Sequence, residues 1–359
     1  MPEFLACLPN VFVVRDTYQI VLNTIEPGIC RLFIGDDEVF ESVIGVYPSE
    51  SAVHKFTLPQ AQLDAAGAYT VTFRAVPEKK PYYTQAGEER RAVFSFTPCR
   101  GDDLRAIYLA DLHGRYAQGI AAARAYTEKP DFIIVNGDLG EIDSPDSLVR
   151  MNEFIGNLSG GGIPVLYGRG NHDTRGRMAE ILPQYMPNDN GRTYFPFRFG
   201  PLGGAILDWG EDKYDDCVEY GGTNCFEHFR RTEAHEIAFW RLPETRYRLV
   251  VSHVPFITDS SMHGPFDIMR ETYRSMNRTV NRWRPDLMIC GHTHQYEYYP
   301  AGKDGCRAAH TYPIAVGSCL DKGMSCTGLH ITPAGIELAR VTAEGTCDAW
   351  ETVPLQERT

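Results

Sequence analysis

The stretch IPVLYGRGNHD at residues 163–173 has the strongest single motif of the sequence, Gly170-Asn171-His172-Asp173. Its first six residues form a short apolar run that ends in glycine, which predicts a strand buried on both faces. Three consecutive polar side chains, Asn171, His172 and Asp173, follow the glycine turn. Ligand sites of open α/β sheets lie beyond the carboxyl ends of the strands. The stretch therefore predicts an α/β sheet with a functional site at this strand end.

Four further apolar runs have the same form and the same kind of ending. They are LRAIYLA (104–110), DFIIVNG (131–137), YRLVVSH (247–253) and DLMICGH (286–292). In chain order they carry or lead into Asp111 and His113, Asp138, His253, and His292 and His294. Helical stretches at 120–126 and 147–158 alternate with these runs, so we expect a layered α/β domain. Five strand-end loops would then converge on one crevice.

The side chains at these strand ends are of the types that bind first-row transition metals. Carboxylate, imidazole and amide-oxygen ligands together suit Mn, Fe, Zn or Ni rather than a thiolate site. Taken singly, a histidine after a strand is more often a structural polar residue than a ligand. The repetition of the same context at five strand ends indicates a metal centre in this domain.

The first hundred residues have a different pattern, in which short runs rich in β-branched and aromatic residues alternate with turn signals. This pattern predicts an all-β sandwich of the immunoglobulin or fibronectin type over residues 1–100, followed by the α/β domain over 101–359. Leu63, Gly67 and Tyr69 resemble a tyrosine corner, although a plain hydrophobic strand start explains them equally well. A length of 359 residues agrees with two domains.

The motifs D-x-H, G-D, G-N-H-D, H and G-H-x-H, in this order, resemble those of the calcineurin-like metallophosphoesterases over residues 104–341. The resemblance implies a four-layered α/β/β/α domain, in which two mixed sheets are flanked by helices. It also implies a metal-dependent phosphoric ester hydrolase that acts on a small phosphate ester. The sandwich before this domain resembles the fibronectin-like N-terminal domain of purple acid phosphatases.

The resemblance implies two divalent metal ions, with Mn, Fe and Zn all open as their identity. One ion would be held by Asp111, His113, Asp138 and His294, and the other by Asp138, Asn171, His253 and His292. Asp138 would thus bridge the two ions, which would share a hydroxide that attacks phosphorus. His172 would protonate the leaving group, and Asp173 would orient the His172 imidazole.

Two positions depart from the purple acid phosphatases. This chain has His113 where those enzymes carry glycine, and Glu141 where they carry tyrosine. Without that tyrosine no iron–phenolate ligand can form, so a purple Fe(III) centre is not expected. The metal site therefore resembles that of the non-purple members of the family.

Four residues near these motifs are candidate substrate contacts. Arg169 and Arg175 flank the G-N-H-D loop, where they could bind phosphate oxygens or be surface arginines paired with acidic neighbours. Tyr220 and Asn224 lie in the long acidic segment 208–227. Such a segment could form a rim of the substrate cavity or a solvated loop.

Three other functions are considered. A phosphodiesterase that acts on a cyclic nucleotide or another diester needs the same ligands and the same His172 as a phosphatase. A non-catalytic metal-binding scaffold is disfavoured, because every ligand of the motif set and His172 are present. An adhesion or carbohydrate-binding role of the sandwich lacks the supporting row of aromatic residues.

Composition limits the partners and the compartment. The formal net charge of −12 argues against a nucleic-acid polymer as partner, and no stretch approaches 18 apolar residues, so no membrane span is expected. Two divalent ions would still place positive charge in one crevice for a small anionic substrate. Residues 1–8 lack a signal-peptide pattern, so we expect a cytoplasmic location, or secretion if a leader precedes this sequence. The sequence does not indicate the oligomeric state.

The sequence contains ten cysteines, and none of them forms the C-x-x-C pair of a zinc or redox motif. Free thiols in a reducing compartment are therefore expected. Cys217 and Cys225 are the pair in which a disulfide would be checked first.

Overall fold

Two β-sheets form the centre of the computed structural model, which describes residues 1–256, 268–302, 310–317 and 323–358. One sheet has nine strands in the order β21-β20-β19-β10-β11-β12-β1-β2-β5, and the other has six in the order β13-β14-β15-β16-β18-β17. The strands of the first sheet are β1 (Asn10–Val14), β2 (Thr17–Asn23), β5 (Val53–Pro59), β10 (Leu104–Leu109), β11 (Phe132–Asn136), β12 (Pro164–Gly168), β19 (Ser325–Thr332), β20 (Gly335–Thr342) and β21 (Cys347–Val353). Those of the second are β13 (Phe195–Phe199), β14 (Leu202–Leu207), β15 (Tyr247–Ser252), β16 (Leu287–Cys290), β17 (Glu297–Tyr299) and β18 (Ile314–Val316).

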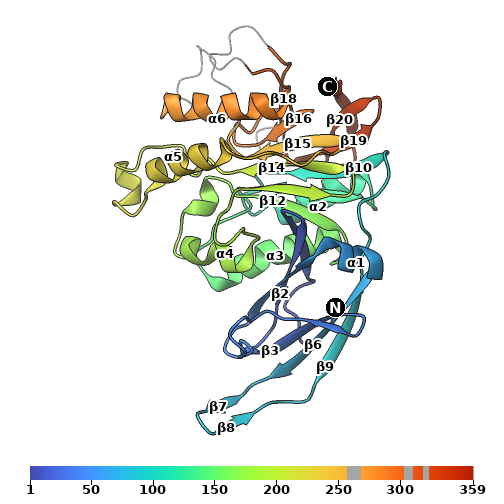
Figure 1. The fold of residues 1–359 in the computed structure, drawn as a ribbon, viewed down its shortest axis with the longest axis vertical. Coiled ribbons are helices and arrows are strands. Elements are labelled where there is room, and N and C mark those ends of the chain that lie inside the picture. The colour runs from blue at the N-terminus through green and yellow to red at the C-terminus, as the bar shows by residue number, and fades with distance from the viewer. Residues whose placement is uncertain (257–267, 303–309, 318–322, 359) are drawn as a thin grey trace.

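Helices cover the outer faces of both sheets, which confirms the predicted four layers α/β/β/α (Figure 1). They are α2 (Tyr116–Tyr126), α3 (Pro145–Ser159) and α4 (Leu182–Tyr185) on the nine-stranded sheet, and α5 (Phe226–Ile237) and α6 (Arg270–Trp283) on the six-stranded sheet. Separate hydrophobic clusters fill the interfaces between the layers. In β11, Phe132 and Ile134 face the other sheet, whereas Ile133 and Val135 face the helices. The uniformly apolar run thus reflects a strand buried on both faces.

The crossover helix α3 connects β11 to β12. Ser144 caps its first turn by accepting a hydrogen bond from the backbone N–H of Ser147, and Pro145 occupies the first helical turn. Gly160 ends the helix in the left-handed conformation. The crossover lets β11 and β12 pair in parallel, so their carboxyl ends lie at the same edge of the sheet.

The N-terminal strands form the predicted sandwich, and three of them also extend the nine-stranded sheet. A four-stranded sheet of β3 (Gly28–Ile34), β4 (Asp37–Val39), β6 (Ala68–Ala75) and β9 (Arg90–Ser95) packs against β2 and β5. The segment also contains α1 (Gln60–Ala66) and a hairpin of β7 (Glu78–Lys80) and β8 (Tyr83–Gln85). β1 pairs in parallel with β12, with Val11 opposite Pro164. The division into folding units at residue 100 stays a prediction.

Tyr69 connects the sandwich to the α/β part of the chain. Its side chain is buried, and its hydroxyl donates a hydrogen bond of 2.6 Å to the carbonyl oxygen of Gly161. A tyrosine corner instead bonds to backbone a few residues upstream. Because Gly161 lies 92 positions downstream, the tyrosine-corner interpretation is wrong.

The described cysteines are all free, and these include Cys217 and Cys225. The disulfide considered for that pair is therefore not formed. Within the described ranges, every helix is too short or too polar to cross a lipid bilayer.

Candidate metal centre

Five strand-end loops bring the predicted ligands together at one edge of the two sheets. In the nine-stranded sheet, the parallel strands β10, β11 and β12 lead into Asp111, Asp138 and Asn171. In the six-stranded sheet, the parallel strands β15 and β16 lead into His253 and His292. Ligand atoms lie within 4.8 Å of one another in three groups: Asp111, His113 and His294; His113, Asp138 and His172; and Asp111, Asp138 and His253. The strand ends thus converge as the sequence predicts.

Asp138 lies between the two predicted sets of ligands. Its Oδ2 atom is 3.3 Å from Nε2 of His253 and 3.9 Å from Nε2 of both His113 and His172. The Asp138 side chain is only 2% exposed. A buried carboxylate between imidazoles of both sets is suited to bridge two cations about 3.5–4 Å apart.

The other predicted ligands pair around Asp138. His294 Nε2 lies 3.5 Å from Asp111 Oδ1 and 3.4 Å from His113 Nε2. On the other side, Asn171 Oδ1 lies 2.9 Å from His292 Nδ1. Two ligand atoms that are each about 2.1 Å from one ion are separated by about 3–3.4 Å. These separations therefore suit ligands that share an ion.

Backbone strain is concentrated in these loops. Positive φ angles occur at Asp111 (56°), His113 (45°), Asp138 (54°), His292 (74°) and His294 (56°). Non-glycine residues seldom adopt this region, because the Cβ atom then crowds the backbone. Strain of this kind persists where the surrounding structure requires one side-chain direction, and it is common at functional sites. Here it aims five predicted ligands toward one another.

The glycines of the motifs allow the loops to touch. A Cβ atom on Gly170 would lie 2.5 Å from the backbone nitrogen of Asp138 and still closer to its Oδ1. A Cβ atom on Gly291 would lie 2.6 Å from Oδ2 of Asp111. Both contacts are too short for a real side chain, so a neighbouring loop would have to move. Glycine at these positions therefore keeps the two carboxylates in place.

We expect Gly170→Ala to lower the rate of phosphoester hydrolysis by about a hundredfold, since a misplacement of about 1 Å can cost that much. The added methyl group would push Asp138 from its position. Gly87→Ala is the matched control, because its Cβ would have only ordinary contacts, the nearest at 3.5 Å. Steady-state kinetics and thermal melting of both variants measure the effect. Full activity of Gly170→Ala would refute the positional role.

His253 has a buried nitrogen atom that a metal ion would satisfy. Its side chain is 2% exposed, and Nδ1 lies 2.7 Å from the carbonyl oxygen of Asn136, which fixes a proton on Nδ1. The other ring nitrogen, Nε2, has no hydrogen-bond partner within the described part of the chain, and it faces Asp138 and Asp111. A ligating histidine has this arrangement, with the second ring nitrogen bonded to a backbone carbonyl. The nitrogen and oxygen atoms that face one another at this site are therefore suited to bind a divalent cation.

The charges of the site act on its histidines in opposite directions. Burial and then the charge of His253 lower the pKa of His292 to about 3, so this ring is neutral, as a metal ligand must be. Burial opposes protonation of His253 as well, but Asp138 and Asp111 outweigh it and raise the pKa of His253 to about 10. A cation bound between these groups would compete with that proton for the same lone pair.

His172 borders the predicted ligands and is partly open to solvent. Its backbone N–H donates a 2.8 Å hydrogen bond to Asp138 Oδ1, and its side chain is 44% exposed. The ring packs edge-on against His113, with ring centroids 4.9 Å apart. An exposed imidazole held beside the ligands can meet a substrate. Because its Nε2 also belongs to the group with His113 and Asp138, metal ligation is the alternative role.

Asp173 is placed differently from its predicted role. Its buried Oδ2 accepts hydrogen bonds from the backbone N–H groups of Gly170 (2.9 Å) and Asp138 (3.1 Å) and from the Tyr167 hydroxyl (3.2 Å). Its Oδ1 has no hydrogen-bond partner among the described residues, so Asp173 does not orient the His172 ring. Burial and then the charge of Asp138 raise the pKa of Asp173. The structure thus gives Asp173 a role in joining two ligand loops.

The candidate substrate arginines are both ion-paired. Arg169 Nε lies 2.8 Å from Asp208 Oδ2, and the guanidinium is covered by two aromatic rings. Arg175 forms a two-pronged pair with Glu211, at 2.5 Å and 2.8 Å. Of the two, only Arg175 lines the cavity beside His172. Both arginines thus pair with acidic neighbours, as the second alternative stated, but Arg175 also lies at the cavity.

The acidic segment contributes differently from the prediction. The Tyr220 side chain is buried, and its hydroxyl donates a hydrogen bond to Glu211. Tyr220 and Asn224 are not among the residues that line the cavity. Asp212, which the sequence did not single out, has its Oδ2 atom 4.0 Å from His292 Nε2. The start of this segment, rather than its centre, reaches the predicted ligands.

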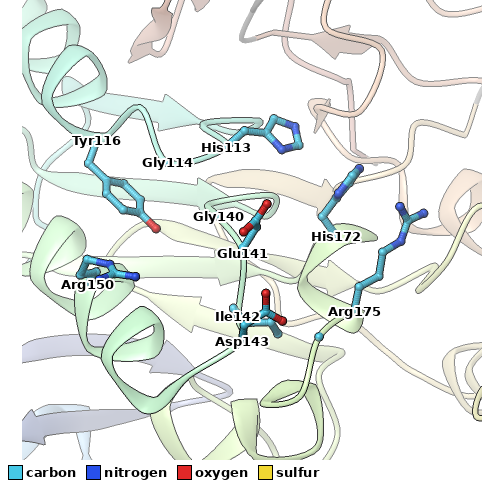
Figure 2. Close-up of a pocket in the computed structure, with 11 residues that line it drawn as sticks. His113, Gly114, Tyr116, Gly140, Glu141, Ile142, Asp143, Arg150, His172 and Arg175 are labelled. Atoms are coloured by element: carbon cyan, nitrogen blue, oxygen red, sulfur yellow. The ribbon is translucent and has the colours of Figure 1, made fainter.

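A cavity of about 700 Å³ opens beside the candidate metal ligands (Figure 2). His113, His172 and Arg175 lie at one side of it, and Tyr116 and Arg150 lie at the other. It is also lined by Glu141 and Asp143 from the loop after β11. Tyr116 and Arg150 come from α2 and α3, and no motif marks them in the sequence. The volume is in the range of small-molecule sites.

Comparisons with known proteins agree with this geometry. The family profile described as calcineurin-like phosphoesterase matches residues 104–296. The structure of the purple acid phosphatase PPD1 from yellow lupin (Lupinus luteus) seeds is similar to 96% of this chain and 74% of that chain, with a TM-score of 0.58 and 11% identity. The structure of PhoD is similar over 97% of this chain and 89% of that chain, with a TM-score of 0.54 and 10% identity. No curated protein sequence matches this chain significantly. At these identities the structural likeness shows the fold alone.

Proposed function

The chain belongs to the calcineurin-like phosphoesterase family, and from this we propose that it hydrolyses small phosphate esters with two divalent metal ions. The position of Asp138 carries the proposal. Its carboxylate is buried, and one oxygen lies within 3.9 Å of imidazoles from both predicted ligand sets. A site for two neighbouring cations would make use of a carboxylate in this position.

The side chains have distinct roles in the proposed reaction. Asp111, His113, Asp138 and His294 would hold one ion, and Asp138, Asn171, His253 and His292 would hold the other. When bound, Mn, Fe or Zn ions would activate a water molecule and offset the charge of the phosphoryl oxygens. His172 Nε2 would carry the proton that passes to the leaving-group oxygen. Asp173 would keep the loops of Gly170 and Asp138 in register.

Hydrolysis of a phosphodiester is the second candidate function. The cavity of about 700 Å³ extends from His172 to Tyr116 and Arg150, which leaves room for an organic group on the phosphate. A diester and a monoester would use the same ligands and the same His172. The protein loaded with Mn should therefore be assayed against phosphomonoesters, phosphodiesters and cyclic nucleotides. Hydrolysis of one class supports the proposal and names the substrate class, whereas no hydrolysis of any would favour a non-catalytic scaffold.

We expect the purified metal-loaded protein to show no intense visible absorption. Purple enzymes of this fold owe their colour to a tyrosine on iron, and this chain has Glu141 at the matching position. Glu141 is exposed and lines the cavity. An absorption spectrum between the ultraviolet and the red, recorded with bound iron, provides the measurement. A strong charge-transfer band would contradict the predicted ligand set.

A further inference from the structure

A second cavity, of about 730 Å³, lies at the opposite edge of the six-stranded sheet from the metal centre. It is lined by Glu244, Thr245, Arg246, Arg248, Arg282, Arg284, Gln356 and Arg358. These residues belong to the amino ends of β15 and β16, the carboxyl end of α6 and the last residues of the described chain. β15 has six residues, so its two ends are about 17–20 Å apart. The cavity is therefore separate from the site at His253.

Among the described residues, the arginines of the cavity outnumber the carboxylates that face them. Arg246 pairs with Asp102, and Arg358 pairs with Asp286 at 2.9 Å. Glu244 is the third carboxylate near the five arginines of the cavity. In a chain with a formal net charge of −12, this excess of positive charge in one cavity is unexpected unless it serves to bind an anion.

The guanidinium groups of Arg248 and Arg282 donate hydrogen bonds to neutral oxygen atoms, although the carboxylates of Asp286 and Glu244 lie near Arg248. Arg248 donates to the carbonyl oxygen of Trp283, and Arg282 donates to that of Ala238 at 3.0 Å. The Nε atom of Arg248 is buried and lacks a hydrogen-bond partner within the described residues. Burial and then the charge of Arg358 lower the pKa of Arg248, although arginine stays protonated in proteins. Positive groups that face each other here would be stabilised by an anion.

Arg284 is the most direct indication of a ligand. It is exposed, lines the cavity, and its guanidinium has no partner among the described residues. Its backbone has φ 49°, in the left-handed region where glycine or asparagine normally ends a helix. An arginine here strains the backbone, and among the described residues its side chain forms no hydrogen bond or ion pair that would offset the strain. A role of the guanidinium in binding would account for it.

We propose that this cavity binds a small anion that bears two or more phosphate groups. Guanidinium groups bind phosphate oxygens in pairs of parallel hydrogen bonds, and arginine is the preferred residue for this contact. The volume exceeds the needs of a single phosphate ion and is in the range of small-ligand sites. The proposed binding site is distinct from the metal centre. The proposal therefore does not depend on whether the protein is a phosphoesterase.

Isothermal titration with imidodiphosphate, a diphosphate whose bridging atom is nitrogen, tests the proposal at constant ionic strength. The Asp138→Asn variant is titrated so that binding at the metal centre is reduced. We expect saturable binding of one equivalent, and roughly tenfold or greater weakening by Arg284→Gly, as is typical for loss of a charge-assisted contact. Arg284→Gly should fold normally, because glycine accepts a positive φ. Arg284→Lys should recover part of the affinity.

Arg278→Ala is the matched control, since Arg278 is exposed on the same helix and does not line the cavity. Its affinity for imidodiphosphate should change less than twofold, because the lost positive charge lies outside the cavity and is screened by salt. If Arg278→Ala and Arg284→Gly weaken the affinity for imidodiphosphate equally, the effect is due to net charge alone, and the proposal is wrong. Absence of saturable binding to Asp138→Asn would also overturn it. Titration with inorganic phosphate tests how many phosphate groups the cavity binds. If inorganic phosphate binds much more weakly than imidodiphosphate, the site holds two phosphate groups, as proposed. If both bind equally well, the site holds one phosphate group and the proposal is wrong.

Discussion

Asp138→Asn is expected to lower kcat/KM for phosphoester hydrolysis by about a thousandfold or more, and to weaken binding of both metal ions. The carboxylate lies between His253 and His113, so one substitution affects both predicted ligand sets. An amide keeps the size of the side chain but removes the negative charge that two cations would share. The backbone N–H of His172 can still donate to the amide oxygen, so the loop has little reason to move.

Metal content and steady-state rates of the purified variant measure this effect. Asp143→Asn is the matched control, because Asp143 lines the same cavity but belongs to none of the ligand groups. The control should bind metal normally and keep most of the activity. Retention of wild-type turnover by Asp138→Asn would rule out the bridging assignment.

His172→Ala is expected to lower kcat by about a hundredfold or more while metal content stays unchanged, as is typical for loss of a general acid. The imidazole is 44% exposed and lies at the cavity, 3.9 Å from Asp138 Oδ2. The loss should be largest for substrates with poor leaving groups, because these depend most on protonation. A substrate with a good leaving group, such as a nitrophenyl ester, should be affected least.

The alternative role of His172 as a ligand gives a different result. His253→Ala provides the comparison, because His253 is buried against Asp138 and Asp111 and should lose metal when truncated. If His172→Ala loses metal to the same extent, and its rate loss is equal for good and poor leaving groups, His172 is a ligand and not the proton donor.

The fold of the α/β part follows from short sequence patterns because each buried strand carries its own signal. In DFIIVNG (131–137), every residue from Phe132 to Gly137 is buried, and the candidate ligand Asp138 follows two positions after the strand ends at Asn136. The order of the motifs then places Asp111, Asp138 and His253 at the carboxyl ends of strands from both sheets, which meet at one site. Local strand signals and the parallel topology were sufficient for this part.

Contacts between distant segments could not be predicted in the same way. The run VFVV (11–14) has no feature that selects β12 as its neighbour, and Arg169 has none that selects Asp208. Asp173 follows His172 in the chain, but the turn directs its carboxylate to the backbone of Gly170 and Asp138. Such partners depend on how loops pack, which a single sequence does not encode locally.

The cavity beside His172 could not be predicted for a related reason. Tyr116 and Arg150 lie on α2 and α3, and on each helix they read as ordinary surface positions. They border the cavity only because both helices cover the nine-stranded sheet near its carboxyl edge. Residues of this kind are found from the structure, whereas the candidate metal ligands could be predicted from the sequence.

Titration of metal-free protein with Mn, followed by the initial rate of phosphoester hydrolysis, tests the two-ion site most directly. We expect no activity without metal, a rise with added Mn, and a plateau at two equivalents per chain, because Asp138 would be shared between the ions. A plateau at one equivalent, or full activity in the presence of a chelator, would contradict this expectation.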